Sequence, residues 1–175
     1  MDVYATQVRE LVDAREIEGL MTHYFDAVDA LDPFRAVEIF TDDIEGDFMT
    51  GHPYVGRRSV ARALGKILVQ YERTSHHITN HRATITGDEA TALTYIYAFH
   101  RMRNSDTTWE LWARHVDDLV RVDGRWKVRR RVLSAIDSVP RWPKIADDWY
   151  YGHPGRRSHD DMERQLRATA EDAPS

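Results

Sequence analysis

The stretch TSHHITN, from Thr74 to Asn80, marks the point at which the chain changes from helical to extended patterning. Before this stretch, apolar residues recur mostly at intervals of three or four, which is typical of amphipathic helices. After it, strand-like segments are separated by turn signals, of which Asp123-Gly124 is a strong hairpin signal. Helices followed by a run of long antiparallel strands predict an α+β domain.

The chain outside this stretch can be divided into expected elements. Helices are predicted over residues 3–31, 34–40 and 57–70. Strands are predicted over residues 44–49, 75–86, 90–103, 108–122 and 125–136. A sheet of this kind could curl around its long helix and leave a concave interior.

The tail differs from the rest of the chain because it is rich in aromatic residues, proline and glycine. It contains PRWP at residues 140–143 and WYYGHPG at residues 149–155, which could form a lid or a subunit contact. Ser158 and Asp161 then form a capping-box pattern for a short final helix. We expect one domain over residues 1–137. The extension over residues 138–175 is expected to pack on that domain, at the mouth of a pocket or on a neighbouring subunit.

Composition narrows the possible functions. The 175 residues are 42% hydrophobic, which suits one domain with a real core. A net charge of −5 argues against nucleic-acid binding, because neutralising phosphates requires a basic face. The absence of cysteine excludes disulfides, thiol nucleophiles and cysteine-ligated metals. A polar N-terminus and the lack of a long apolar run predict a cytoplasmic protein without membrane contact.

Several short phrases, in their order and spacing, resemble the SnoaL-like branch of the nuclear-transport-factor-2-like superfamily. They are Tyr24 with Asp29, FTDD at 40–43, HHITN at 76–80, and Asp117 followed by RVDGRWKVRRR at 121–131. The resemblance covers residues 14–135. It implies a cone-shaped, cystatin-like α+β barrel, with N-terminal helices packed in a curved, mostly antiparallel sheet. The branch includes scytalone dehydratase, hexachlorocyclohexane dehydrochlorinase, bile-acid dehydratase and polyketide cyclases, so the fold hosts several reactions.

The resemblance also implies roles for particular residues. Dehydratases and the dehydrochlorinase of this type use a helix aspartate and a strand histidine as a dyad, which Asp29 and His76 match. His100 matches a second strand histidine, His115 a polar residue on the following strand, and Arg131 an inward arginine on the final strand.

The chain departs from the scytalone dehydratase pattern at two positions. That pattern has tyrosines that hold a water against the substrate carbonyl, where this chain has Val28 and Phe48.

An imidazole oriented by a carboxylate is a general base that needs neither metal nor cofactor. We therefore expect Asp29 to orient His76 as the base and Arg131 to hold the developing anion. His100 and His115 are expected to position or protonate the leaving group. The residues predicted to bind the substrate are Tyr24, Phe48, Tyr54, His115 and Leu133.

A structural explanation competes with each assignment. Asp29 could simply cap the helix end, His76 could be a hydrogen-bonded strand histidine, and Arg131 could belong to a surface ion pair. Three histidines could instead bind a metal ion. The chain lacks the short HxH or HExxH spacing, so no metal is predicted.

The sequence thus predicts a cofactor-independent lyase. Its reaction would be a dehydration, a related β-elimination or a retro-aldol cleavage of a small cyclic or aromatic oxygenated compound. Two alternatives are an isomerase or cyclase acting on a polyketide-like or steroid-like ring, and a non-catalytic ligand-binding or assembly module. The resemblance also implies a homotrimer or homodimer, because relatives bury one sheet face between subunits.

Overall fold

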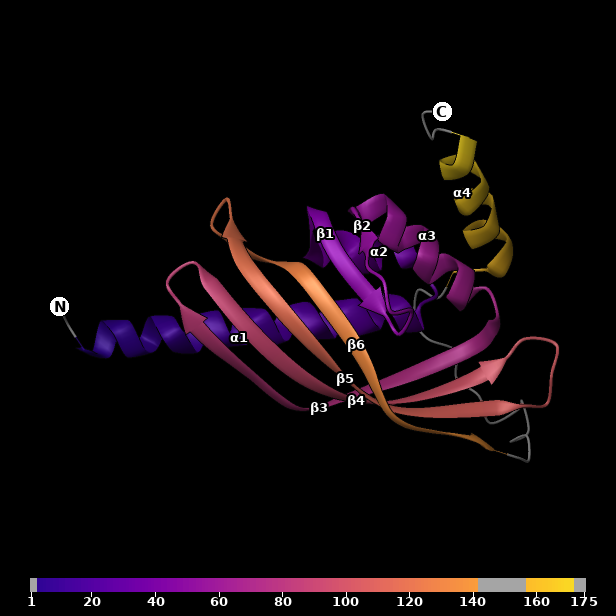
Figure 1. Ribbon diagram of the computed structural model, residues 1–175, viewed down its shortest axis with the longest axis horizontal. Coiled ribbons are helices and arrows are strands. Elements are labelled where there is room, and N and C mark those ends of the chain that lie inside the picture. Colours follow the sequence, from indigo (N-terminus) through magenta and orange to yellow (C-terminus); the bar gives the residue numbers. More distant parts are fainter. Residues whose placement is uncertain (1–2, 142–156, 172–175) are drawn as a thin grey trace.

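The computed structural model describes residues 3–141 and 157–171. In Figure 1, a curved sheet wraps one side of a long helix, and the shorter helices lie beyond the other side. The elements are α1 (Val3–Asp29), α2 (Pro33–Ala36), the 3-10 turn η1 (Val37–Ile39), β1 (Phe40–Phe48), β2 (Tyr54–Val55), α3 (Arg57–Leu68), β3 (Tyr71–Thr86), β4 (Glu89–Met102), β5 (Thr108–Val122), β6 (Arg125–Arg141) and α4 (His159–Glu171).

The sheet has six strands in the order β2-β1-β6-β5-β4-β3. β1 and β6 run parallel, and every other neighbouring pair is antiparallel. The outermost strands, β2 and β3, are not neighbours, so the described sheet is an open cone and not a closed barrel. These features confirm the predicted α+β class with helices packed in a curved, mostly antiparallel sheet.

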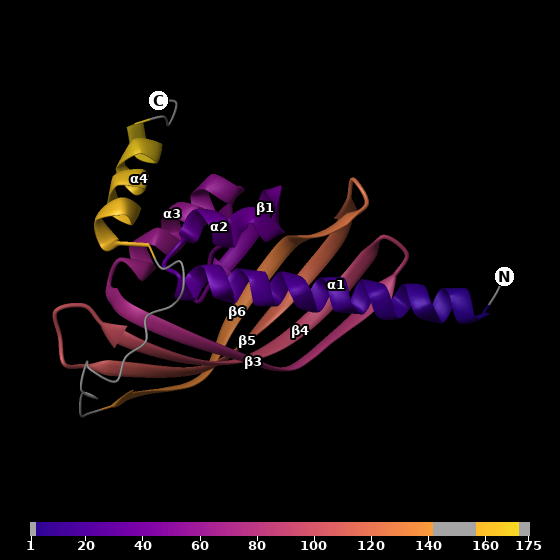
Figure 2. The same ribbon diagram turned by 180° about the vertical axis from the view of Figure 1, so that it is seen from behind.

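Helix α1 packs along the concave face of the sheet. Ile17, Met21, Tyr24 and Val28 recur at helical spacing and are buried, so they form the face that meets the sheet. Towards its N-terminus the helix projects beyond the hairpins, as Figures 1 and 2 both show, and apolar residues such as Leu11 are exposed there. None of the described helices combines the length and apolar content needed to cross a membrane.

A second contact fixes α1 near the turn of the β5–β6 hairpin. Asp13 accepts hydrogen bonds from Arg121 Nη2 at 2.7 Å and from Trp126 Nε1 at 3.2 Å. The Arg121 guanidinium also lies 4.4 Å from the centre of the Trp126 ring. Because both partners flank the β5–β6 turn, this contact sets the position of the helix against the end of the hairpin.

Two element boundaries near β1 differ from the prediction. The expected helix over 34–40 is divided into α2, capped by Asp32, and the 3-10 turn. The strand begins at Phe40 instead of Ile44, because Phe40 already pairs with Val128. The intervening Asp42 and Asp43 are exposed on the strand, so their loop-like composition concealed it.

The remaining differences concern strand length. β3 begins at Tyr71, four residues before the predicted start, and pairs there with Met102. The GHPYVG segment contains a two-residue strand, β2, that pairs with β1. β6 continues beyond Ile136 to Arg141. β1 pairs with β6 only as far as Leu133, so the backbone of Pro140 stands at a sheet edge where proline is tolerated.

The described part of the C-terminal extension contacts the helical side of the domain. The Arg157 N–H donates to Ala30 O at 2.8 Å, and His159 Nε2 lies 2.5 Å from Tyr71 O. Leu166 of α4 packs so closely on α3 that a side chain at Gly65 would overlap it. The Ser158 hydroxyl accepts from the Asp161 N–H at 3.1 Å and donates to Asp161 Oδ2 at 2.8 Å, so Ser158 caps the start of α4. The WYYGHPG segment and the second half of PRWP, residues 142 and 143, lie outside the described residues.

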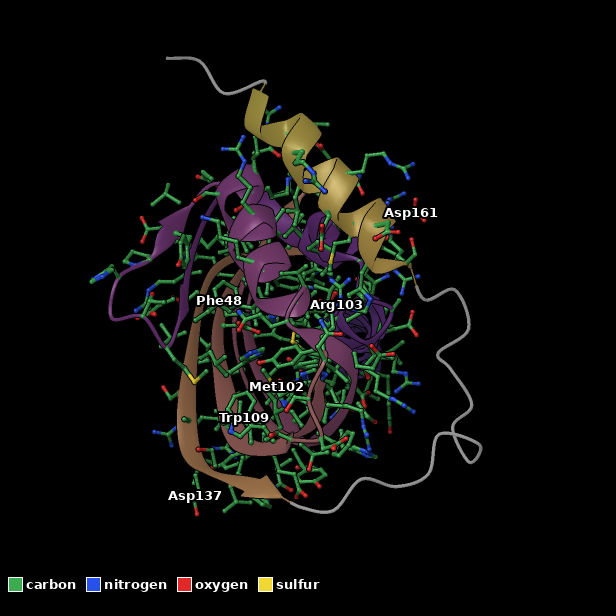
Figure 3. All side chains as sticks on the ribbon, turned by 90° about the vertical axis from the view of Figure 1, so that its right-hand side faces the viewer. Phe48, Met102, Arg103, Trp109, Asp137 and Asp161 are labelled. Carbon is green, nitrogen blue, oxygen red and sulfur yellow. The ribbon has the colours of Figure 1, made fainter. Side chains whose placement is uncertain are left out.

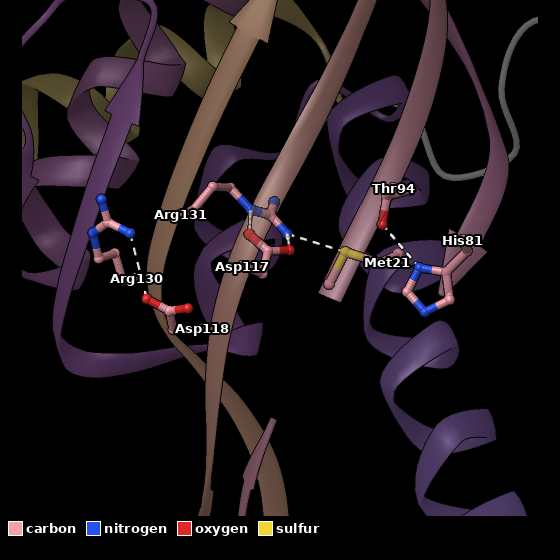
Figure 4. A network of polar contacts seen from close by, with 7 residues as sticks. All are labelled: Met21, His81, Thr94, Asp117, Asp118, Arg130 and Arg131. Atoms are coloured by element: carbon pink, nitrogen blue, oxygen red, sulfur yellow. Dashed lines mark hydrogen bonds and ion pairs between the residues drawn. The ribbon is translucent and has the colours of Figure 1, made fainter. Parts of the chain in front are cut away.

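A buried ion pair lies between the sheet and α1. Arg131 donates to both oxygens of Asp117, at 2.7 Å each, and neither side chain is exposed (Figure 4). The two residues face each other across the β5–β6 ladder. The Arg131 guanidinium also lies 4.4 Å from the centre of the Tyr24 ring and 3.1 Å from Met21 Sδ. Its neighbour Arg130 points the other way and forms an exposed pair with Asp118.

Substitution of Arg131 by methionine is expected to lower the free energy of unfolding by about 3–5 kcal/mol, because it leaves the Asp117 charge buried and unpaired. The double variant Arg131→Met/Asp117→Leu should lose less than the single variant, because no uncompensated charge remains. Urea denaturation of the wild type and both variants measures the difference. Equal losses in the single and double variants would contradict this account.

Candidate active site

Asp29 is placed by the way in which α1 ends. The Leu31 N–H donates to Val28 O at 2.9 Å, and the Asp32 N–H donates to Ala27 O at 2.9 Å. This pair of bonds, with Leu31 at a φ of 57°, is the Schellman arrangement that closes a helix. Leu31 is fully buried, so packing holds a conformation that glycine usually supplies. Asp29 is consequently fixed in the last helical turn, beside β3.

The Asp29 carboxylate receives three hydrogen bonds from β3. Its Oδ1 lies 2.6 Å from His76 Nδ1 and accepts from Thr74 Oγ1 at 2.7 Å. Its Oδ2 accepts from the backbone N–H of His76 at 2.9 Å. The carboxylate therefore binds one strand segment at three points and holds the His76 ring at a single orientation.

This arrangement assigns the tautomer of His76. An ionised carboxylate only accepts hydrogen bonds, so His76 Nδ1 carries the proton that points at Asp29. Nε2 is then the unprotonated nitrogen. It has no hydrogen-bond partner among the described residues, and the His76 side chain is 10% exposed and lines a cavity. An imidazole oriented in this way can take a proton at Nε2.

Electrostatics keep the Asp29 carboxyl ionised. Burial opposes its charge, but the hydrogen bond and positive charge of His76, the backbone N–H of His76 and the Thr74 hydroxyl outweigh that cost. The net effect lowers the pKa of Asp29 below its ordinary value. The carboxylate is thus available at neutral pH to stabilise a protonated His76.

The cavity beside His76 is small and largely apolar. It has a volume of about 100 Å³, on the scale of the roughly 150 Å³ cavity that accepts benzene in an engineered protein core. Residues from α1, α3 and the sheet line it, and Figure 3 shows Phe48 and Trp109 from two of its walls at one end of the molecule. The hydroxyl and imidazole groups on its wall belong to Tyr24, Tyr71, His76, His100 and His115.

His100 lies next to His76, with ring centres 5.4 Å apart. Its ring stacks on Trp109 at 4.6 Å, and its Nδ1 lies 3.3 Å from the backbone oxygen of Trp109. Burial, and then the proximity of the positive charge that His76 can carry, lowers the pKa of His100 to about 4. His100 is therefore neutral near pH 7, where it cannot donate a proton as an acid.

His115 is held in an aromatic stack that includes Phe25. The Phe25 ring lies between the two imidazoles, 5.0 Å from His76 and 5.4 Å from His115, and nearly parallel to both. Burial, followed by the charges of Arg131 and His76, lowers the pKa of His115 well below its ordinary value. Its Nδ1 is buried without a hydrogen-bond partner. This second neutral imidazole completes the polar part of the wall.

The structure brings most of the predicted residues together. Tyr24, Phe48 and Leu133 line the same cavity as the three histidines. Tyr54 does not, because its strand β2 pairs with the outer side of β1 and places it in a separate surface groove beside α3. Arg131 is also absent from the cavity wall, since its guanidinium is bound to Asp117 and covered by the Tyr24 ring.

Sequence reasoning missed Thr74, Phe25, Tyr71 and Trp109. Thr74 was placed before the strand, although it stands within β3 and supports Asp29. Phe25 follows Tyr24 in α1, and nothing in the helical pattern distinguishes a packing aromatic from one placed between two histidines. Within residues 3–141 and 157–171, no group of three or more histidine, aspartate or glutamate side chains is arranged to hold a metal ion.

A comparison with protein-family models identifies the family of this chain. The model of the SnoaL-like domain matches residues 9–132, which is well over half of the sequence. The chain therefore belongs to the SnoaL-like domain family. No protein with a curated description matches the sequence.

Solved structures with the same fold include two of lyase-type enzymes. A putative scytalone dehydratase from Novosphingobium aromaticivorans DSM 12444 is 26% identical, with a TM-score of 0.70 over 82% of this chain and 95% of its own. A type 2 hexachlorocyclohexane dehydrochlorinase is 19% identical, with a TM-score of 0.75 over 82% and 99%. A nuclear-transport-factor-2-like protein with a cystatin-like fold, also from N. aromaticivorans, is 21% identical, with a TM-score of 0.66 over 78% and 91%.

The substitution Asp29→Asn is expected to reverse the tautomer of His76. The backbone N–H of His76 is a fixed donor, so the amide oxygen must face it and the NH₂ group must face Nδ1. The imidazole proton then moves to Nε2. Nitrogen-15 NMR of histidine-labelled protein should show Nδ1–H in the wild type and Nε2–H in the variant. Retention of Nδ1–H in Asp29→Asn would contradict this geometry.

The free energy of unfolding is expected to fall as the pH drops from about 6.5 towards 4. In that window the unfolded chain binds a proton at His100 that the folded chain, with a pKa of about 4, does not bind. Stability therefore rises with pH there. Asp29 affects the free energy of unfolding in a different pH range. Because its pKa is lowered, its stabilising contribution is complete above the ordinary carboxyl pKa and is lost at more acidic pH.

Denaturation of His100→Phe tests this assignment, because phenylalanine keeps the ring packing on Trp109 and removes the titrating group. The slope of unfolding free energy against pH should decrease by up to about 1.4 kcal/mol per pH unit between pH 4 and 6.5. An unchanged slope would show that His100 is not the residue responsible.

Proposed function

We propose that this protein is a cofactor-independent lyase that uses Asp29 and His76 as its general base. The observation that carries the proposal is the 2.6 Å contact between Asp29 Oδ1 and His76 Nδ1, made beside a cavity that His76 lines. The substrate class we propose is a small cyclic or aromatic oxygenated compound, which suits the size and apolar wall of the cavity.

The proton can be followed through an elimination. His76 Nε2 removes a proton from a carbon next to a carbonyl or ring, and the electron pair of that C–H bond forms the new double bond. The bond to the leaving group breaks with its electron pair. Asp29 stabilises the imidazolium that forms. When the leaving group is a hydroxyl, the imidazolium returns the proton and water departs. General acid–base catalysis of this kind contributes about 10²–10⁴-fold.

The neutral state of the neighbouring imidazoles supports a single-base mechanism. His100 and His115 are expected to be uncharged near pH 7, so they can position a substrate but have no proton to give to a leaving group as cationic acids. His76 is then the group that both accepts and returns the proton. Of the two roles expected for His100 and His115, positioning the leaving group is therefore kept, and protonating it is assigned to His76.

Two other functions are distinguished by the products. An isomerase would give a product of unchanged mass, and a lyase gives one that has lost water, a halide or a small aldehyde. A non-catalytic module would bind a ligand without converting it. An imidazole held by a carboxylate at the cavity wall favours an enzyme over a binding module, because binding alone does not require an oriented base.

A panel of hydroxy-ketones, aromatic diols and halogenated rings should reveal a substrate, with products identified by mass spectrometry. On that substrate, Asp29→Asn and His76→Gln are each expected to lower kcat by about 10²–10⁴-fold. The matched control is His77→Gln, because His77 is the next residue of the strand and contacts Tyr97 on the opposite face of the sheet.

Wild-type turnover in His77→Gln, with loss in the other two variants, is the expected pattern. Circular dichroism and urea denaturation establish that all three variants are folded. If Asp29→Asn and His76→Gln both retain wild-type kcat, the dyad is not the catalytic base.

A further inference from the structure

We propose that the cavity selects an uncharged ligand that presents a hydroxyl group to His100, and that it rejects carboxylates and phosphates. The proposal rests on the proposed function only in taking this cavity as the substrate site. It goes further in assigning a charge and a hydrogen-bonding group to the substrate.

The first observation is that no free cation faces the cavity among the described residues that line it. Arg131 donates two hydrogen bonds to Asp117 and lies behind the Tyr24 ring, so its guanidinium does not line the cavity. The pair is neutral as a whole and fully buried. An anionic substrate would find no counter-charge here.

The second observation concerns the only imidazole with a carboxylate partner in this cavity. His76 is bonded to Asp29, so the two groups together carry no net charge when His76 is protonated and a negative charge when it is not. In the state that is ready to act as a base, the local charge is therefore negative. Burying a further anion against it would cost desolvation energy and electrostatic repulsion without compensation.

The third observation fixes what His100 offers to a ligand. Its Nδ1 faces the backbone oxygen of Trp109 at 3.3 Å, and a carbonyl oxygen only accepts hydrogen bonds. The proton of the neutral ring therefore resides on Nδ1, and Nε2 presents a lone pair. Nε2 has no partner among the described residues. Its complement in a ligand is a donor, and a hydroxyl is the uncharged donor that suits an oxygenated ring.

The ring of His100 is also held in place. It stacks on Trp109, which Figure 3 labels, and its centre lies 4.7 Å from that of the Tyr71 ring. These two contacts restrict rotation of the imidazole, so Nε2 keeps its direction. The centres of the His76 and His100 rings are 5.4 Å apart. A ligand on the scale of one ring can thus place a C–H bond near the first histidine and a hydroxyl near the second.

Binding of phenol, anisole and benzoate at neutral pH tests the proposal. The three have similar shapes and differ in the property at issue: a neutral donor, a neutral ether without a donor, and an anion. NMR titration of isotope-labelled protein should show phenol binding at least about tenfold more tightly than anisole, and no benzoate binding at concentrations where phenol saturates.

The variant His100→Phe keeps the ring packing and removes the acceptor. The preference for phenol over anisole should become smaller in this variant, because His76 Nε2 is then the remaining assigned imidazole acceptor among the described residues of the wall, and benzoate should still be rejected. The control His77→Phe alters a histidine on the other face of the strand and should keep the wild-type preference. Equal binding of phenol and anisole by the wild type, binding of benzoate, or no binding of phenol would each overturn the proposal.

The same titrations on Asp29→Asn separate this proposal from the proposed function. If that variant retains both turnover and the preference for phenol, the catalytic assignment fails and the selectivity stands. If turnover depends on Asp29 but the wild type binds benzoate, the selectivity fails and the catalytic assignment stands.

Discussion

Three hydrogen bonds to the carboxylate of Asp29 join the long helix α1 to strand β3 of the sheet. Asp29 accepts from Thr74 and from both the ring and the backbone of His76, so the end of α1 is fixed to the sheet. The same contacts assign the imidazole tautomer and leave Nε2 open to the cavity. The contact that joins α1 to the sheet therefore also sets the orientation and tautomer of His76, the residue that we propose as the base.

Asp117 and Asp29 have different kinds of partner. Asp117 faces Arg131, a cation that keeps its proton, so their pair is a permanent feature of the core. Asp29 faces His76, an imidazole that can accept and release a proton, so this pair can take part in proton transfer. The Asp117–Arg131 pair lies behind the Tyr24 ring and forms no part of the cavity wall, so the Asp29–His76 pair is the ion pair that borders the cavity.

The sequence was sufficient to predict the fold class, and its resemblance to the SnoaL-like branch implied the pairing of Asp29 with His76. Helical periodicity places the aspartate at the end of α1, and strand alternation gives His76 a defined face. It did not determine strand register, which decides that Asp117 lies opposite Arg131 and removes the arginine from the cavity wall. The sequence also did not reveal the short β1–β2 pairing that places Tyr54 outside the cavity, because a two-residue strand has almost no periodic pattern. Aromatic stacking around Phe25 depends on tertiary packing alone.

Helix α1 is attached to the sheet by an aspartate at each end of its buried half. Asp13 is bound by Arg121 and Trp126 beside one hairpin, and Asp29 is bound sixteen residues later by β3, which is about 24 Å along the axis. Because α1 is bound at both Asp13 and Asp29, these contacts oppose both sliding along its axis and rotation about it. Insertion of a single residue between these contacts would turn one carboxylate by about 100° relative to the other. The spacing between Asp13 and Asp29 thus fixes the direction in which the Asp29 carboxylate points relative to the β5–β6 hairpin.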